Sequence, residues 1–259
     1  MGNSILAKKS LGQHWLKDET TLASICDAAG LSQTDTVLEI GPGLGHLTRQ
    51  LLSRAGKVIA VELDKNLAIK LAAELPELKV VQADILQFDL NELPANYKVV
   101  ANIPYYLTSN LIRTLSESAN PPELMVLLVQ KEVAVRLAAA PGQMSLLSVS
   151  AQLYFEPQLG PVVPAEMFEP PPKIDSQVIV LRRRQLPLFK HLDTKLFFRI
   201  VKAGFSGRRK KLRGSLAAGL GIEKSQADEL LQDAGISGDL RAQNLDLADW
   251  HRLYEVVIK

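Results

Sequence analysis

Several features that would define a class of protein are scarce or missing in this sequence. Among its 259 residues is a single cysteine, Cys26, so an internal disulfide framework is excluded, and no metal-ligand spacing connects it with the four scattered histidines. Residues 1–9 lack the apolar core of about 7–15 residues found in a secretory leader, and nowhere do about 18 apolar residues run together. We therefore expect a cytoplasmic protein without a metal site or membrane segment, in which Cys26 is a buried apolar residue.

Apolar residues, in contrast, are plentiful enough for a large core. With 47% hydrophobic composition, the chain suits one large domain and one small one. Up to residue 184, short apolar or β-branched runs alternate with helical patterns, which indicates an α/β domain with a mainly parallel sheet. Beyond Leu186–Leu188 the pattern is helical only. The predicted domains are an α/β domain over residues 1–184 and a helical domain over residues 185–259.

The positions of the individual elements follow from the same patterns. Strands are expected at Thr36–Ile40, Val58–Val61, Lys79–Val81, Tyr97–Ala101, Met125–Val129, Tyr154–Pro161 and Asp175–Leu181. Helices are expected at Thr20–Ala29, Lys65–Leu75, Ser109–Leu115, Glu132–Ala140, Lys195–Ala203, Arg209–Ala218 and Leu247–Ile258, and another begins with a cap at Ser225.

The positive charge is concentrated in one segment, Lys173–Ser215. This segment has 13 Lys and Arg residues and two Asp, whereas the rest of the chain has 17 basic and 26 acidic residues. Its densest parts are Arg182–Arg184 and Arg208–Lys211. Such a run is often only a solvated helix face, but its concentration in a chain with a net charge of +2 favours a polyanionic partner.

A glycine loop follows the first predicted strand. After Thr36–Ile40 the sequence reads Gly41-Pro42-Gly43-Leu44-Gly45 and then changes to helical leucine spacing. Glycines let the backbone approach a ligand closely, and the helix start offers unpaired amides. The spacing is G-x-G-x-G and not the G-x-G-x-x-G of a dinucleotide loop, because position 46 is His.

Acidic residues stand at the ends of the next two strands. Glu62 lies 21 positions after Gly41, where an acid grips ribose hydroxyls in nucleotide-binding α/β units. Asp84 is placed to accept from an adenine amine, with Ile85 packing on the ring. The alternative is that both acids cap the helices that follow. Two such acids beside a glycine loop favour the binding role.

Asn102-Ile103-Pro104-Tyr105 follows a further buried strand. Pro104 cannot continue the strand, which leaves neighbouring carbonyls for a ligand. An exocyclic amine suits this site, because it can donate to the Asn102 oxygen and the Pro104 carbonyl while its ring stacks on Tyr105. Phe168, in a proline-rich loop, is placed to supply a second ring. The alternatives are a plain strand-to-turn connection and a phenylalanine that caps the core.

These motifs resemble, over essentially the whole chain, those of the KsgA-type small-subunit ribosomal RNA adenine dimethyltransferases, which have the class I (Rossmann-like) methyltransferase fold and a small helical C-terminal domain. Trp15 stands where phenylalanine is usual, and Lys211 and Gly214 depart from the commoner threonine and asparagine. The matching segments are Lys9–Leu16, Glu39–Gly45, Asn102–Tyr105, Pro164–Ser176, Phe205–Leu216 and Arg241–Leu245.

The resemblance implies an S-adenosylmethionine-dependent enzyme. Its substrate would be the N6 amines of two adjacent adenosines near the 3′ end of 16S rRNA in the small (30S) ribosomal subunit, and it would also act in the biogenesis of that subunit, as a monomer. The implied cofactor residues are Gln13, His14, Leu16, Gly41, Glu62, Asp84 and Asn102. The implied catalytic residues are Asn102, Pro104, Tyr105 and Phe168, of which the two rings sandwich the target base.

Three alternatives stay open at this point. A resistance methyltransferase of the Erm type would share the Asn102–Tyr105 chemistry but act on large-subunit RNA. A noncatalytic assembly factor would bind the immature small subunit. A nicotinamide dehydrogenase would share the α/β fold, although the glycine spacing opposes it.

Overall fold

In a computed structural model of the chain, residues 11–207 and 209–259 are described, so Lys9, Ser10 and Arg208 of the motifs above lie outside the described residues. The chain divides into two compact units. The first comprises the chain up to Val135 together with Glu156–Arg183, and the second comprises Arg136–Phe155 and Arg184–Lys259. Helix α5 (Lys131–Leu137) crosses this division.

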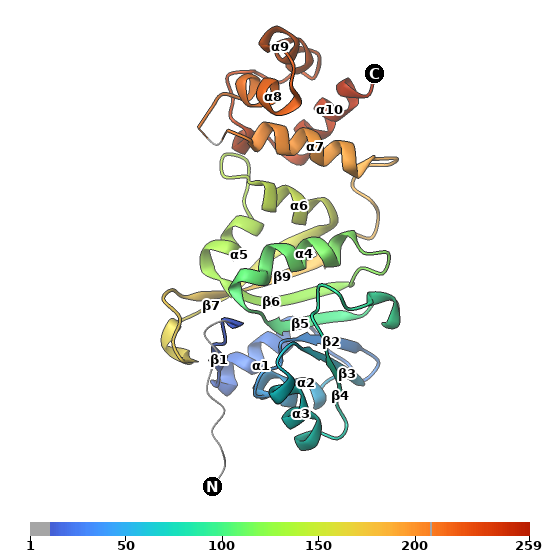
Figure 1. Ribbon diagram of the computed structural model, residues 1–259, viewed down its shortest axis with the longest axis vertical. Coiled ribbons are helices and arrows are strands. Elements are labelled where there is room, and N and C mark those ends of the chain that lie inside the picture. The colour runs from blue at the N-terminus through green and yellow to red at the C-terminus, as the bar shows by residue number, and fades with distance from the viewer. Residues whose placement is uncertain (1–10, 208) are drawn as a thin grey trace. The chain divides into compact units, whose positions relative to one another are not determined.

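The first unit is organised by a seven-stranded sheet in the order β4-β3-β2-β5-β6-β9-β7 (Figure 1). From β4 to β6 all neighbours are parallel, and β9 is antiparallel to β6. Ligands bind in such sheets where the strand order reverses, here between β2 and β5. The strands are β2 (Thr36–Ile40), β3 (Lys57–Glu62), β4 (Lys79–Gln82), β5 (Lys98–Asn102), β6 (Leu124–Gln130), β7 (Phe155–Val163) and β9 (Ser176–Arg183).

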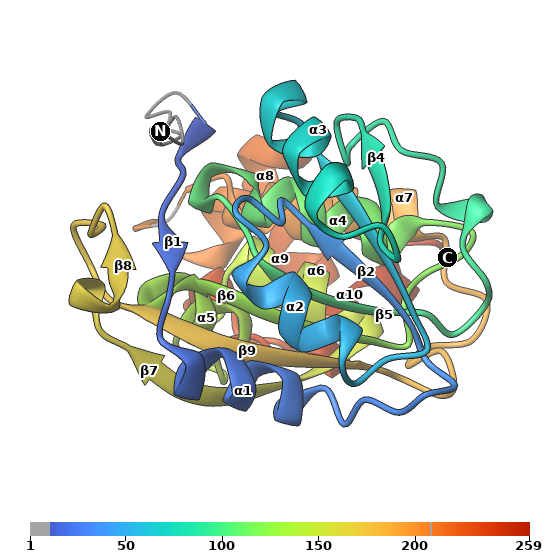
Figure 2. The ribbon, with the colours of Figure 1, turned by 90° about the horizontal axis from the view of Figure 1, so that it is seen from below.

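Helices cover both faces of the sheet, which explains the unbroken apolar runs of the central strands. Buried residues of α1, α2 and α3 pack in one cluster with alternate residues of the strands, for example Val58 and Ala60 of β3. Helix α4 lies on the face opposite to α1 (Figure 2). These helices are α1 (Glu19–Ala28), α2 (His46–Leu52), α3 (Lys65–Glu74) and α4 (Thr108–Glu117).

A second, two-stranded sheet joins the N-terminal arm to the proline-rich loop. β1 (Trp15–Leu16) runs antiparallel to β8 (Phe168–Glu169), and Leu16 lies opposite Phe168. Lys17 also forms an ion pair with Glu169. The arm and the loop are therefore held together although about 150 residues separate them.

The second unit is a helical bundle around Trp250, which is fully buried. A Cβ atom on Gly204 would lie 2.4 Å from the indole ring, so the close packing of Trp250 requires glycine there. The helices are α6 (Leu146–Tyr154), α7 (Thr194–Phe205), α8 (Leu212–Leu220), α9 (Lys224–Asp233) and α10 (Leu247–Val257). α7, at 12 residues, is the longest α-helix in the described part of the chain, which contains none long and apolar enough to cross a membrane.

The predicted fold class is confirmed, with a Rossmann-like sheet domain and a helical C-terminal part. Two details differ from the sequence analysis. Helix α9 begins at Lys224, with Glu223 at its N-cap position, so the cap predicted at Ser225 is wrong: the Glu223 amide donates to the Gln226 side chain at 2.9 Å. Residues 136–155 group with the second unit, because α6 packs among its helices.

Candidate cofactor and substrate site

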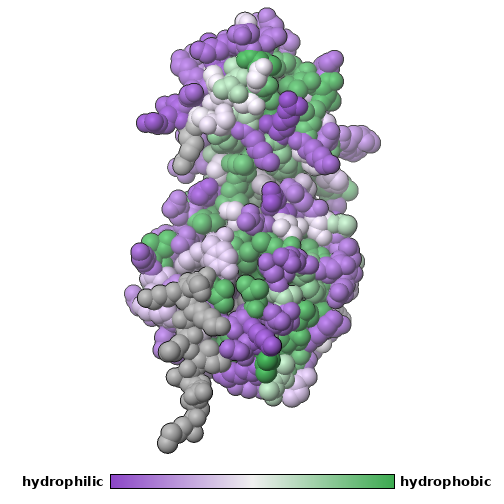
Figure 3. All heavy atoms as spheres, viewed as in Figure 1, coloured by the Kyte–Doolittle hydropathy of each residue, from purple (hydrophilic) through white to green (hydrophobic). Residues whose placement is uncertain are grey.

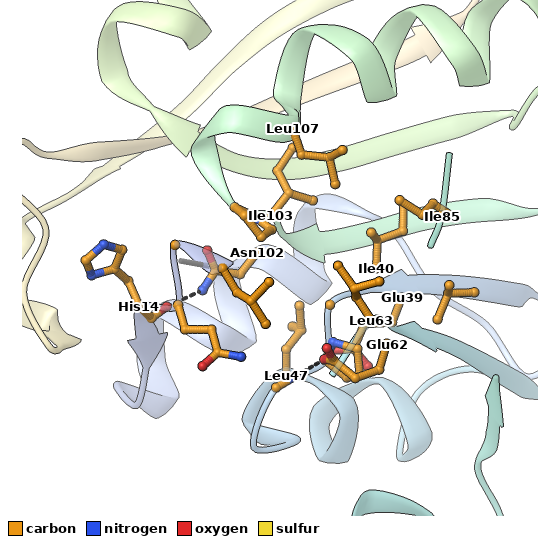
Figure 4. A pocket seen from close by; sticks show the side chains of 18 of the residues that line it. His14, Glu39, Ile40, Leu47, Glu62, Leu63, Ile85, Asn102, Ile103 and Leu107 are labelled. Atoms are coloured by element: carbon orange, nitrogen blue, oxygen red, sulfur yellow. Dashed lines mark hydrogen bonds between the residues drawn. The ribbon is translucent and has the colours of Figure 1, made fainter. Parts of the chain in front are cut away.

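The parallel strands β2, β3 and β5 end at one edge of the sheet, at Ile40, Glu62 and Asn102. The loops that follow these ends, together with the N-terminal arm, enclose a pocket. Figure 4 shows His14 and Asn102 at one side of it and Glu39 and Glu62 at the other. All of the predicted cofactor residues line this pocket, namely Gln13, His14, Leu16, Gly41, Glu62, Asp84 and Asn102.

The glycine loop forms one wall of the pocket. Gly41, Gly43 and Gly45 have φ angles of 64°, 58° and 78°, which L side chains rarely adopt. A Cβ atom on Gly43 would also lie 3.1 Å from the ring of Trp15. The loop therefore needs glycine both for its backbone conformation and for the close approach of the arm.

Glu62, at the end of β3, also lines the pocket and is 5% exposed. Its carboxylate accepts from the Gly43 amide at 3.1 Å and from the Asp64 amide at 2.8 Å. A carboxylate has about four acceptor positions, so Glu62 retains acceptor capacity for a ribose hydroxyl. Burial raises the pKa of Glu62, while hydrogen bonds from the backbone amides of Asp64, Gly43 and Leu63 act in the opposite direction. Glu62 does not cap α3, because Asp64 does.

Glu39 is a second buried acid in the pocket, at 2% exposed. Burial raises its pKa to about 8, and the nearby charge of Glu62 adds to the rise. Its Oε2 atom has no hydrogen-bond partner in residues 11–207 and 209–259. Glu39 is therefore protonated at neutral pH unless a positively charged or donor group approaches it.

Asp84 and Ile85 line the pocket beyond β4. Asp84 Oδ1 accepts from the Leu86 amide at 3.0 Å, so one oxygen shapes the local turn. This agrees in part with the capping alternative, but the carboxylate keeps further acceptor capacity toward the pocket. Ile85 is buried, as a residue packed beneath a ligand ring would be.

The arm closes over the pocket through Asn102. The Asn102 Nδ2 atom donates to the His14 carbonyl at 3.1 Å, and His14 Nδ1 donates to the Pro170 carbonyl at 2.7 Å. Gln13 also lines the pocket. The hydrogen bond from Nδ2 leaves the carboxamide oxygen of Asn102 as an acceptor for a ligand.

Pro104 and Tyr105 form the rim next to Asn102. The Pro104 carbonyl accepts from the Leu107 amide at 3.0 Å, which leaves one lone pair for a substrate amine. The Tyr105 hydroxyl bonds to the Ser176 hydroxyl at 2.8 Å, and its ring is stacked with His14, with centroids 5.9 Å apart. Burial raises the pKa of Tyr105, so it stays neutral. The hydrogen bond to Ser176 and the stacking with His14 together fix the position of the Tyr105 ring.

Phe168 is not brought to the pocket. Its side chain is 4% exposed and packs in the core with Leu16 and Val178. The backbone pairing of β8 with β1 turns the ring inward, opposite Leu16. In this position Phe168 occupies the core, as the alternative in the sequence analysis described, and its role in a base sandwich stays a prediction.

The basic segment Lys173–Ser215 differs from residue to residue in how its charges are paired. Lys211 and Arg213 both contact Asp239, and Arg213 also lies 3.4 Å from Asp228. Arg209 and Lys210 are exposed and pair with no acid among the described residues. The dense run is therefore partly neutralised by acids from elsewhere in the second unit.

Three polar atoms of the pocket are buried without a hydrogen-bond partner in the described part of the chain: Trp15 Nε1, Glu39 Oε2 and His46 Nε2. An unpaired buried polar group costs about 1–3 kcal/mol, so a ligand with several polar groups would be favoured here. Burial lowers the pKa of His46, which keeps its ring neutral. Together with the glycine loop and Glu62, these atoms fit a nucleoside carrying an amino-acid group. In residues 11–207 and 209–259 no cluster of three His, Cys, Asp or Glu could hold a metal ion.

The fold and this pocket define a class I S-adenosylmethionine-dependent methyltransferase. The family model for ribosomal RNA adenine dimethylase matches residues 5–259. The chain belongs to that family and is an rRNA adenine dimethyltransferase, which confirms the resemblance and the predicted cofactor and excludes the dehydrogenase alternative.

Individual relatives agree with this assignment. The chain is 43% identical to ribosomal RNA small subunit methyltransferase A of Dehalococcoides mccartyi strain 195, over 97% of this chain and 89% of the relative. Among solved structures, a dimethyladenosine transferase from Plasmodium falciparum is 26% identical with a TM-score of 0.79, covering 93% of this chain and 96% of that one. The 23S rRNA methyltransferase ErmE is 31% identical with a TM-score of 0.75, covering 95% and 100%.

Some pocket residues were missed as individual site residues in the sequence analysis. Glu39 could have been identified from the sequence, because it lies inside the apolar run Thr36–Ile40. Burying a carboxylate in a strand that is covered on both faces is unfavourable unless the carboxylate serves a ligand. His46 and Ser176 carried none, since only the folded chain shows that they reach the pocket or Tyr105.

Proposed function

We propose that this enzyme dimethylates the N6 amines of two adjacent adenosines near the 3′ end of 16S rRNA in the small ribosomal subunit. The observation that carries the proposal is that one pocket joins the cofactor wall of Gly41 and Glu62 to the rim of Asn102, Pro104 and Tyr105. The small subunit as substrate is supported by the name of the relative from Dehalococcoides mccartyi.

Positioning of the amine is the main chemical task of the chain. S-adenosylmethionine supplies, when bound, an electrophilic methyl group on a sulfonium. The carboxamide oxygen of Asn102 and the second lone pair of the Pro104 carbonyl accept from the amine and aim its nitrogen. Holding the amine nitrogen in line with the methyl group removes most of the entropic barrier, so no strong base is required.

Tyr105 holds the target base after it leaves its stack. Its ring is fixed by Ser176 and His14, so little conformational entropy is lost when a base stacks on it. For the predicted sandwich, Phe168 has to leave the core position beside Leu16. A base clamped by Tyr105 alone is the arrangement that needs no such movement.

The basic segment Lys173–Ser215 is proposed to contact RNA phosphates. Such contacts carry no sequence information, so the choice of adenosines comes from RNA shape and unpaired bases.

Like the predicted base sandwich, the monomeric state and the cytoplasmic location remain our expectations. They suit an enzyme whose substrate is the ribosome.

The test is incubation with labelled S-adenosylmethionine and undermethylated small subunits, with large subunits in parallel, followed by digestion of the RNA to nucleosides. We expect N6,N6-dimethyladenosine from the small subunit only. Label confined to the large subunit would overturn the proposal in favour of the Erm-type activity, which the similarity to ErmE makes the natural competitor.

A role in small-subunit assembly is a second candidate that can coexist with catalysis. The unpaired cations of the basic segment would bind the subunit whether or not methyl transfer follows. Asn102→Ala separates the two, because it removes the amine acceptor without touching the segment. A cell whose assembly defect is rescued by Asn102→Ala as well as by the native chain would support the assembly role.

A further inference from the structure

Within the basic segment Lys173–Ser215, helix α7 of the second unit carries a row of cations. Lys195, Arg199 and Lys202 are exposed, and their spacing of four and three residues puts them on one helix face. The opposite face carries Phe197, Ile200 and Val201, which are fully buried. With a rise of about 1.5 Å per residue, the row extends over about 10 Å.

These three side chains line a hollow between α7 and α8, together with Ala203, Ser206 and Gly219. A Cβ atom on Gly219 would lie 2.4 Å from the Ala203 Cα, so the two helices are in backbone contact there. The absence of a side chain on Gly219 therefore allows this close approach of the two helices beside the three cations. In the space-filling view, hydrophilic side chains occupy much of the surface over α7–α9 (Figure 3).

No acid among the described residues forms an ion pair with Lys195, Arg199 or Lys202. The acid next to the row in sequence, Asp193, is the cap of α7 and accepts from the Lys195 and Leu196 amides. This differs from Lys211 and Arg213, whose charges meet Asp239. Like charges three and four residues apart also destabilise a helix, so the row lowers the stability of α7 and forms no ion pair that would offset this.

We infer that Lys195, Arg199 and Lys202, around the hollow at Gly219, bind the sugar-phosphate backbone of the RNA substrate. A row of separated charges matches a linear polyanion better than a single small anion, which three spaced side chains would not surround. The inference rests on the proposed function for the identity of the RNA. It places the phosphate contact on α7, outside the dense Arg208–Lys211 run.

The experiment compares the native chain with K195A/R199A/K202A in binding to a naked RNA fragment from the 3′ region of small-subunit rRNA, between 50 and 300 mM salt. Each lost phosphate contact lowers the slope of log K against log salt by about 0.7–0.9, so the slope should fall by about two to three. At 100 mM salt we expect affinity to fall by about 10- to 100-fold.

Two control variants test the interpretation. K57A/K65A/K79A removes the same charge from exposed lysines of the first unit and should keep the native slope. K195R/R199K/K202R keeps the charges and should keep the slope as well. S-adenosylhomocysteine affinity, measured by calorimetry, should be equal in all four proteins, and native helical circular dichroism and melting temperature show that the second unit of the triple alanine variant is folded.

A native slope in K195A/R199A/K202A would overturn the inference. So would loss of binding to intact small subunits with unchanged binding to the naked fragment, since the partner of α7 would then be a ribosomal protein. If the native chain methylates small subunits but K195A/R199A/K202A keeps the native salt slope, the inference about α7 is refuted and the proposed function stands. If the salt slope falls in K195A/R199A/K202A but the native chain methylates no small subunit, the proposed function is refuted and RNA binding by α7 is supported.

Discussion

The two units present ionisable groups in opposite environments. In the first unit, Glu39 and Glu62 are buried acids in a pocket, with pKa values raised by burial. In the second, Lys195, Arg199 and Lys202 are exposed cations without acid partners among the described residues. The electrostatic interactions of a buried charge are strong and little screened by salt, whereas those of a single exposed charge are weak and strongly screened.

This difference suits the two ligands. A small cofactor enclosed in a pocket can be recognised by a few buried groups, at a strength that salt hardly changes. A long polyanion is held instead by many exposed cations that release counterions, and its affinity falls steeply with salt. Changes in the pocket should therefore alter cofactor binding, chemistry or folding, and changes on α7 should alter RNA affinity alone.

The largest effect is expected from Phe168→Ala. The side chain is buried beside Leu16, so its removal should lower the free energy of unfolding by about 3–5 kcal/mol. Denaturant unfolding measures this, and Met167→Ala, at an exposed neighbour, is the control. If Phe168→Ala leaves stability unchanged while activity falls, Phe168 serves the base and not the core.

Next in size is Asn102→Ala. Loss of the amine acceptor should reduce methyl transfer by about 100- to 1,000-fold, as loss of one well-placed hydrogen-bonding group does in other enzymes. Single-turnover transfer to saturating small subunits is the measurement, with exposed Asn91→Ala as the control. RNA affinity and its salt slope should stay native, and a joint loss would contradict the separation of the two units.

Glu39→Gln should change how stability depends on pH. Because the folded-state pKa of Glu39 is raised from 4.5 to about 8, the native state holds a proton that the unfolded state has lost. Stability should therefore fall as pH rises from about 4.5 to 8, by about 4 kcal/mol, and the Gln variant should lack this loss. Unfolding at pH 5 and 8.5 without cofactor tests this, and a pH-independent difference between the two proteins would contradict it.

The smallest effect is expected from Asp239→Asn, which releases Lys211 and Arg213 from their shared acid. RNA affinity should rise by about two- to fivefold at low salt, with a slope steeper by up to about one. Asp233→Asn, an exposed acid that forms no ion pair in the described part of the chain, is the control. Reduced RNA affinity in Asp239→Asn would indicate that this cluster positions the bound RNA.

Much of the first unit could be predicted because its signals are local. The strand ends at Glu62 and Asn102 and the glycine loop follow from short apolar runs and their next residues, and the structure brings them into one pocket. Phe168 could not be placed, since its burial depends on pairing with Leu16, 152 positions earlier. The ion pairs of the basic segment could not be predicted either, because Lys211 contacts Asp239, which lies 28 positions away in the sequence.

One measurement tests the separation of the two units most directly: the affinities of the same protein for S-adenosylhomocysteine and for small-subunit RNA, each determined across a range of salt. We predict that the RNA affinity falls linearly with log salt while the S-adenosylhomocysteine affinity changes by less than about twofold. Two affinities that fall in parallel, or an RNA affinity that ignores salt, would contradict the account.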